Sequence, residues 1–267
     1  MSVITTSSAW GASGSAYLVS GWYKFTTLTA TRCLWSSGTT FCSQIAATTS
    51  ELTMGSDGAT TDSVWTTSGL GLTTGKWWHI SWLASCAQTG TGEAWRVWIA
   101  DAEHPPTEVT VTLTTAIVGA FTSSTTLVLG NRTTAGALAI QGSMSSFMAI
   151  AQGAGNSSVA SLPMTAFGAI TQVEADQVRE RLLVPLWQGN PDWRFSLLRA
   201  AGVDRLIYVP LTLETGTSSY SYYTRAYGVS DTTPQGVMTF RAGTASGEQP
   251  PTRLNPNWPL RRYIRRR

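Results

Sequence analysis

The stretch "GKWWHISW", residues 75–82, places three tryptophans and one histidine within eight residues. Successive side chains of a β-strand point to opposite faces of the sheet. Trp78 and Trp82 are therefore expected to share one face of a strand, and Trp77 and His79 the other. The stretch predicts a core strand whose first face is buried and whose second face is partly exposed or covered by a partner.

The composition favours one all-β domain with extensions. The 267 residues are 42% hydrophobic and only 12% charged, and they include 25 glycines and 12 tryptophans, which suits many short strands joined by tight turns. Cys33, Cys42 and Cys86 are odd in number and form no CxxC pair. We therefore expect buried, reduced thiols rather than a disulfide framework or a zinc site.

The N-terminal residues show no basic segment followed by an apolar run, and no stretch approaches the roughly 18 apolar residues that suggest a membrane span. These features predict a protein without a signal peptide, made in the cytoplasm of its host cell. They also predict no contact with a membrane.

Short runs rich in β-branched and aromatic residues follow one another from residue 15 to residue 150, bounded by Gly, Asn, Asp or Ser. This pattern predicts an all-β sandwich. A helix is expected over 170–183, where Thr171 and Glu174 have the spacing of a capping box. A second short helix is expected over 191–201.

The domain organisation follows from a change of composition near residue 243. We expect one domain over 1–242, with a helical excursion at about 170–202, and a proline-rich extended arm over 243–267. Residues 253–267 hold six arginines and no acid, so residues 1–252 carry 12 basic and 15 acidic groups, a net charge of −3. The body is mildly acidic and the arm strongly basic.

The arm is either a disordered solubilising tail or a docking element. Its aromatic and aliphatic side chains can anchor in pockets, and its arginines can form paired hydrogen bonds with carboxylates or phosphates. Solubility alone requires no anchors, which favours docking on an acidic protein surface, and the acidic body argues against nucleic acid. The candidate docking residues are Trp258, Arg261, Arg262, Tyr263, Ile264, Arg265, Arg266 and Arg267.

Several landmarks occur in a fixed order between about residues 15 and 183: "SGWYKF", "GKWWHISW", "WRVWIAD", "LVLGN", "GSMSSFMAIAQGA" and "TQVEADQV". Their order resembles the laminin-G-like, concanavalin-A-like jelly-roll family, and the segment from "LIYVPLTLE" to "EQPPTR" is similar to the end of compact members from bacteriophages and bacteria. The resemblance implies a two-sheet antiparallel jelly-roll sandwich with one or two short helices. The turn "DAEHPP" replaces the Asp-Gly pair of the family, so a longer or stiffer loop is expected there.

The residues show no catalytic constellation. Sandwich glucanases of this architecture carry paired carboxylates at alternate positions of one strand, and no expected strand has such a pair. Glu174 and Asp176 lie on the expected helix, where a two-residue step points them in different directions, so Glu174 is interpreted as a cap. His79 and His104 are the only histidines, and no GxSxG elbow occurs. We expect no enzyme.

No metal or cofactor site is expected either. A hard cation needs several converging oxygens, whereas Asp57, Asp62, Asp101 and Asp231 are isolated along the chain. No glycine-rich loop with a GK[ST] ending is present.

The tryptophans leave two alternatives, sugar stacking or core packing. Alternation along the expected strands favours the core for most of Trp22, Trp35, Trp65, Trp77, Trp95 and Trp98. The candidate face for a glycan or a partner consists of Trp77, His79 and Trp98.

Two functional hypotheses follow. The first is a bacteriophage virion structural protein, a decoration or cement protein on the capsid surface. Its arm would dock on the major capsid protein or another virion subunit, with self-association, for instance as a trimer. The second is a lectin-like tail or head-fibre protein that binds surface glycans of the host.

Overall fold

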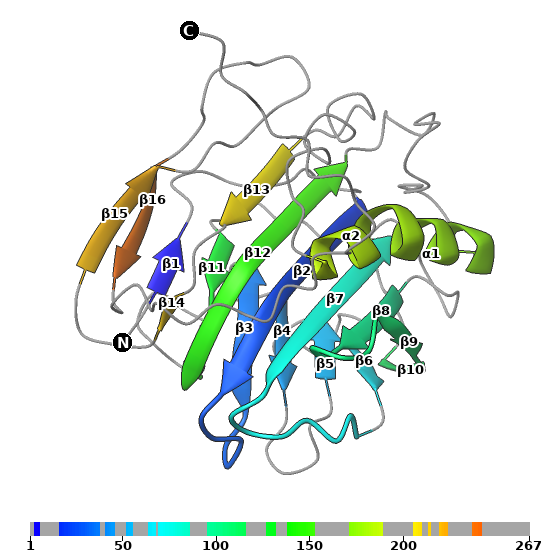
Figure 1. Ribbon diagram of the computed structural model, residues 1–267, viewed down its shortest axis with the longest axis horizontal. Helices are drawn as coiled ribbons and strands as arrows, with labels where there is room; N and C mark the ends of the chain where they lie inside the picture. The colour runs from blue at the N-terminus through cyan, green and yellow to red at the C-terminus, as the bar shows by residue number, and fades with distance from the viewer. Residues whose placement is uncertain are drawn as a thin grey trace, which may run out of the picture.

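The computed structural model shows two antiparallel β-sheets packed face to face, with one helical segment against the smaller sheet (Figure 1). It describes residues 3–5, 16–37, 41–45, 52–55, 64–67, 69–85, 95–115, 127–131, 138–152, 171–188, 205–209, 213–214, 219–223 and 237–241. The expected jelly-roll sandwich is confirmed.

Within the described residues the larger sheet has the strand order β10-β6-β5-β4-β3-β11-β1-β16-β15, and the smaller has the order β13-β12-β2-β7-β8-β9, with β14 paired to β12. The strands of the larger sheet are β1 (Val3–Thr5), β3 (Arg32–Ser37), β4 (Phe41–Ile45), β5 (Leu52–Gly55), β6 (Val64–Thr67), β10 (Val111–Thr115), β11 (Leu127–Leu129), β15 (Ser219–Tyr223) and β16 (Val237–Arg241). Those of the smaller sheet are β2 (Ala16–Phe25), β7 (Trp77–Ser85), β8 (Trp95–Ala100), β9 (Thr107–Val109), β12 (Gly142–Gln152), β13 (Arg205–Val209) and β14 (Leu213–Glu214).

Strand β7 lies between β2 and β8, and its inner face meets the larger sheet. Trp82 of β7 stands edge-on to Trp35 of β3, with ring centroids 6.0 Å apart, and edge-on to Tyr23 of β2, at 6.4 Å. All three side chains are almost fully buried. This aromatic contact joins the two sheets, because rings packed edge to face bury large apolar area in a favourable geometry.

The outer face of β7 is also buried, and the chain itself covers it. Trp22 of β2, Trp77 of β7 and Ala100 of β8 form one buried cluster with Trp187 of the helical segment. The prediction that this face is partly exposed or covered by a partner is therefore wrong. The alternation in residues 75–82 separates two apolar environments, one between the sheets and one beneath the helix.

The helical segment begins where the sequence predicts. It starts with α1 (Gln172–Val178), continues as a π-helical turn, η1 (Arg179–Leu183), and ends with α2 (Val184–Trp187). The backbone N–H of Glu174 donates to Oγ1 of Thr171 at 3.3 Å, and the backbone N–H of Thr171 donates to Oε2 of Glu174 at 2.8 Å. The capping box is confirmed.

The helix runs four residues further than the expected end at residue 183. Pro185 has no N–H to donate, and in a regular α-helix its ring would crowd the carbonyl four residues earlier. The wider winding of η1 just before Pro185 accommodates this residue, as π-turns do within other helices.

Polar contacts fasten the helix to β8 and β9. Nη1 of Arg96 donates to Oε1 of Glu108 at 2.8 Å and to Oε1 of Gln172 at 3.0 Å. Nε2 of Gln172 donates to Oε2 of Glu108 at 2.9 Å, and Nε of Arg179 donates to the carbonyl of Pro106. The helix is thereby held at a fixed position over the sheet.

Several expectations fall on residues outside the described ranges. They are the second helix over 191–201, the arm over 243–267 and the domain boundary between 242 and 243.

Cys33 is buried, and its thiol donates to the carbonyl of Trp35 at 3.2 Å. Among the described helices, none has the length and apolar character needed to cross a bilayer.

Candidate functional site

The start of β7 and the end of β8 lie side by side at one end of the smaller sheet. His79 is paired with Ala100 in the antiparallel register, so the residues just before β7 adjoin those just after β8. This register brings Lys76 to Asp101, and their Nζ and Oδ2 atoms are 2.7 Å apart. We refer to Lys76, Trp78, Asp101 and His104 as the end cluster.

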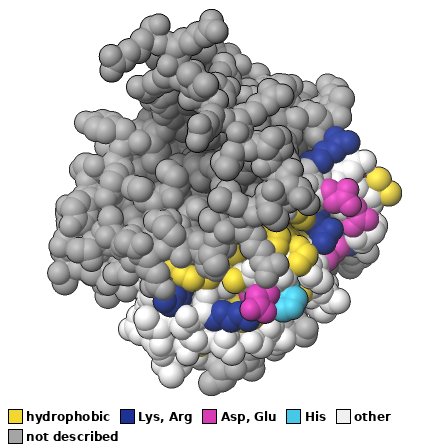
Figure 2. Space-filling model, in the orientation of Figure 1, with side chains coloured by type: hydrophobic (Ala, Val, Ile, Leu, Met, Phe, Trp, Pro, Cys, Tyr) yellow, Lys and Arg dark blue, Asp and Glu magenta, His cyan; other side chains and the backbone are white. Residues whose placement is uncertain are grey.

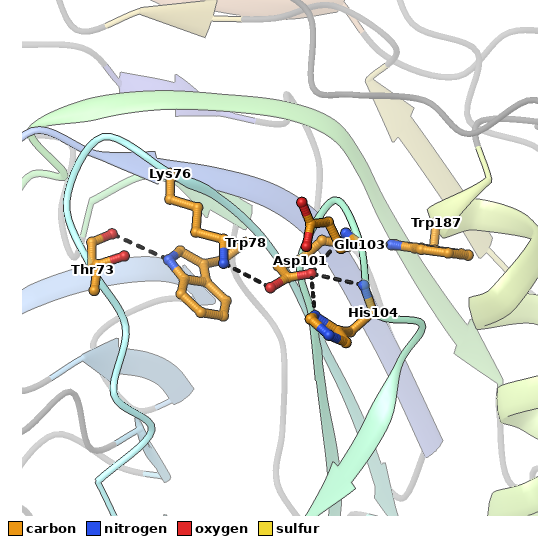
Figure 3. A network of polar contacts seen from close by, with 7 residues as sticks. All are labelled: Thr73, Lys76, Trp78, Asp101, Glu103, His104 and Trp187. Atoms are coloured by element: carbon orange, nitrogen blue, oxygen red, sulfur yellow. Dashed lines mark hydrogen bonds and ion pairs between the residues drawn. The ribbon is translucent and has the colours of Figure 1, made fainter.

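The carboxylate of Asp101 organises the turn that follows β8 (Figure 3). Its Oδ1 accepts hydrogen bonds from the backbone N–H of Glu103 at 2.8 Å and from the backbone N–H of His104 at 2.7 Å. The same oxygen lies 2.9 Å from Nδ1 of His104. An aspartate that binds the backbone two or three residues ahead stabilises a tight turn. This contact stiffens the "DAEHPP" loop.

Asp101 is ionised although its side chain is only 7% exposed. Burial by itself raises the pKa of this carboxyl, but hydrogen bonds to the charged form outweigh burial. They come from Lys76, from the two backbone N–H groups and from the His104 ring, and they hold the pKa of Asp101 well below its usual range. The end cluster is thus built around a carboxylate that is negatively charged at neutral pH.

The backbone of Asp101 also holds the end of the helix. Nε1 of Trp187, the last residue of α2, donates to the carbonyl oxygen of Asp101 at 2.6 Å. Asp101 therefore joins the turn before β7, the turn after β8 and the end of the helical segment. The geometry of the site depends on all three.

Three side chains of the end cluster reach the surface. The side chain of Lys76 is 45% exposed and that of His104 is 73% exposed, and Trp78 is half-buried. Nζ of Lys76 lies 4.8 Å from the centroid of the Trp78 ring, a cation–π contact. Nε1 of Trp78 donates to the carbonyl of Thr73 at 3.1 Å, which fixes the indole against the turn before β7.

Figure 2 shows histidine, acidic and basic side chains close together in the lower part of the view. His104 is exposed, whereas His79 is buried. The described surface thus combines a cation, an imidazole and a partly exposed indole at one end of the sandwich.

The three residues predicted to form a glycan or partner face are buried. Trp77 is 6% exposed, and His79 and Trp98 are each 1% exposed. His79 Nε2 lies 2.9 Å from Oγ of Ser20, which is itself 2.9 Å from Oγ of Ser81. That expectation is corrected, because side chains buried to this extent offer no surface to a sugar. The predicted docking residues of the arm lie outside the described ranges.

Sequence reasoning missed the end cluster. Along the chain Asp101 is isolated from the other acids, and no periodicity links it to Lys76, which lies 25 residues earlier. One signal was available. The Asp-x-x-His spacing of Asp101 and His104, just before two prolines, is typical of a turn in which the aspartate binds the backbone ahead of it.

Three of the described carboxylates are engaged in structural contacts. Asp101 accepts hydrogen bonds at both oxygens and stays charged, so it has no proton to give as a general acid. Glu174 caps the helix, and Asp176 accepts from Gln172 on its exposed side. Among the described residues, no group of three or more His, Cys, Asp or Glu side chains is placed to hold a metal ion.

Among known proteins, this chain has similarity in fold and none detected in sequence. No family model and no curated protein matches the chain. One similar solved structure is a Bacteroides ovatus protein provisionally described as carbohydrate-binding, with a TM-score of 0.51 and 12% identity over 92% of this chain and 57% of that one. A heptameric pentraxin of Limulus polyphemus has a TM-score of 0.36 and 13% identity over 56% of this chain and 69% of that one. The chain spans little more than half of the Bacteroides protein. The first likeness supports the fold, a two-sheet β-sandwich.

Proposed function

We propose that the protein is a carbohydrate-binding module and that the end cluster is its sugar site. The observation that carries the proposal is the convergence of Lys76, Trp78 and His104 at one end of the sandwich. The buried charge of Asp101 holds both Lys76 and His104 in place. The similarity in fold to a protein provisionally described as carbohydrate-binding supports the proposal.

The chemistry of the cluster suits a polyhydroxylated ligand. A sugar presents C–H surface, which packs against an indole, and hydroxyl groups, which need donors and acceptors. Lys76 supplies donors, His104 can accept, and Trp78 supplies apolar surface. Because Asp101 already orients Lys76 and His104, a ligand loses little side-chain freedom when it binds them.

The proposed module is not an enzyme. A glycosidase needs a protonated carboxylic acid and a second carboxylate on opposite sides of the bond that breaks. The carboxylate of the end cluster is charged and occupied by hydrogen bonds. This arrangement supports binding without turnover.

Replacing Trp78 with alanine should weaken oligosaccharide binding about tenfold, because the change removes the apolar surface of the site and the contact that orients Lys76. A panel of neutral oligosaccharides, screened by calorimetry and by quenching of tryptophan fluorescence, measures the effect. Val173→Ala is the matched control, since Val173 is a 66% exposed hydrophobic residue on the helix and should leave affinity unchanged. Equal affinity of Trp78→Ala and wild type, with both folded, would contradict the site.

We also propose that the module acts on a virion, as a capsid decoration protein that docks through its arm or as a fibre protein that carries the sugar site to the host surface. The specific observation is the basic, aromatic composition of residues 253–267. A chain ending at Glu248 should no longer cosediment with particles that lack this protein, whereas the full chain should bind and be released by salt. Equal binding of the two chains would exclude the arm as the anchor.

A further inference from the structure

His104 and Asp101 together determine which nitrogen of the imidazole carries the proton. An ionised carboxylate only accepts hydrogen bonds, and Oδ1 of Asp101 lies 2.9 Å from Nδ1 of His104. The salt bridge from Lys76 and the two backbone N–H groups keep the carboxylate ionised. In the neutral ring, Nδ1 must therefore hold the proton and Nε2 must hold the free lone pair.

The Nε2 atom of His104 is available to a ligand. The side chain is 73% exposed, and no described residue makes a hydrogen bond to Nε2. Lys76 donates to Oδ2, the other oxygen of the same carboxylate. Lys76 and His104 are therefore linked through Asp101. Lys76 can only donate, whereas Nε2 of the neutral ring can only accept.

We propose that Nε2 of His104 accepts a hydrogen bond from a hydroxyl group of the bound sugar, while Lys76 donates a hydrogen bond to an oxygen of the same sugar. Asp101 is the positioning residue, because it sets the tautomer without touching the ligand. This inference rests on the proposed function and deepens it. The ligand class is a neutral sugar with a free hydroxyl that donates to His104.

The test uses the full chain and two measurements. The affinity of wild type and of each variant for a neutral oligosaccharide selected from the panel is measured by calorimetry. The ring nitrogens of the ligand-free protein are observed by nitrogen-15 NMR, and only two histidines need to be distinguished. His104→Asn is the key variant, because its amide can still donate to Asp101 but has no atom at the position of Nε2. His104→Gln places an amide oxygen near that position, so this variant keeps an acceptor there.

We expect His104→Asn to bind about tenfold more weakly than wild type, and His104→Gln to recover most of that affinity. The NMR spectrum should show a protonated Nδ1 and an unprotonated Nε2 in the neutral ring. If the oligosaccharide binds equally to wild type and His104→Asn, or the proton is on Nε2, the inference is wrong and the proposed function stands. If no oligosaccharide binds the wild type, both are wrong.

Discussion

Replacing Gly142 with alanine is expected to lower the free energy of unfolding by on the order of 4 kcal/mol. Gly142 begins β12 at a φ of 144°, a backbone conformation that residues with a side chain rarely adopt. It pairs with Phe25 of β2, and a Cβ atom there would lie 1.9 Å from the carbonyl oxygen of Lys24. That atom belongs to the backbone of a central strand, so it cannot move aside without disrupting the pairing of β12 with β2.

The matched control is Gly75→Ala. Gly75 also has a positive φ, of 76°, but an added Cβ would meet nothing within 4 Å. Only backbone strain remains, and it should cost about 1 kcal/mol. Urea denaturation of the two variants beside wild type measures the difference. Similar losses for both would show that the approach of β12 to β2 at Gly142 does not limit stability.

Asp101→Ala is expected to lower the free energy of unfolding by on the order of 3 kcal/mol. The change removes the acceptor of two backbone N–H groups, those of Glu103 and His104, and the partner of the Lys76 ammonium. The contact from Trp187 goes to the main-chain carbonyl and survives the substitution. The loss should therefore come from the turn after β8 rather than from release of the helix.

Asp101→Asn removes the charge of the side chain but keeps its shape. The amide oxygen can still accept from the backbone, but the ion pair with Lys76 is lost, so we expect a smaller loss of about 1–2 kcal/mol. Thermal or urea unfolding of the two variants gives the comparison. An alanine variant no less stable than the asparagine variant would contradict the role given to the backbone hydrogen bonds.

The stabilising effect of the Asp101 charge should also depend on pH. The pKa of Asp101 is lower in the folded chain than the value of about 3.9 of an unfolded aspartate. The unfolded chain therefore takes up a proton first as the pH falls, and the contribution of the charge is complete above about pH 5 and is lost progressively below it. The difference in stability between wild type and Asp101→Asn should be constant from about pH 5 to 8 and shrink toward about pH 2. A constant difference over the whole range would contradict this linkage.

Local patterns predicted part of this structure well, because their physical causes are local. Alternation in residues 75–82 predicted β7, since side chains on a strand must alternate between faces. The capping box of Thr171 and Glu174 was readable because both partners lie within one helical turn. The end of the helix was misjudged at residue 183, since the wide turn before Pro185 continues the helix to Trp187.

The candidate site depended on contacts between segments far apart in the chain. Trp77, His79 and Trp98 have the residue types of a sugar site, yet all three are buried, and Trp77 packs in one cluster with Trp187 of the helical segment. Lys76 and Asp101 look like unrelated surface charges until the register of β7 with β8 places them 2.7 Å apart. The sequence by itself determined the sandwich, because the alternation of apolar residues sets which strands have buried faces. Only the tertiary structure decided which tryptophans and which charges reach the surface, because burial depends on what packs above a residue and not on its own neighbours in the chain.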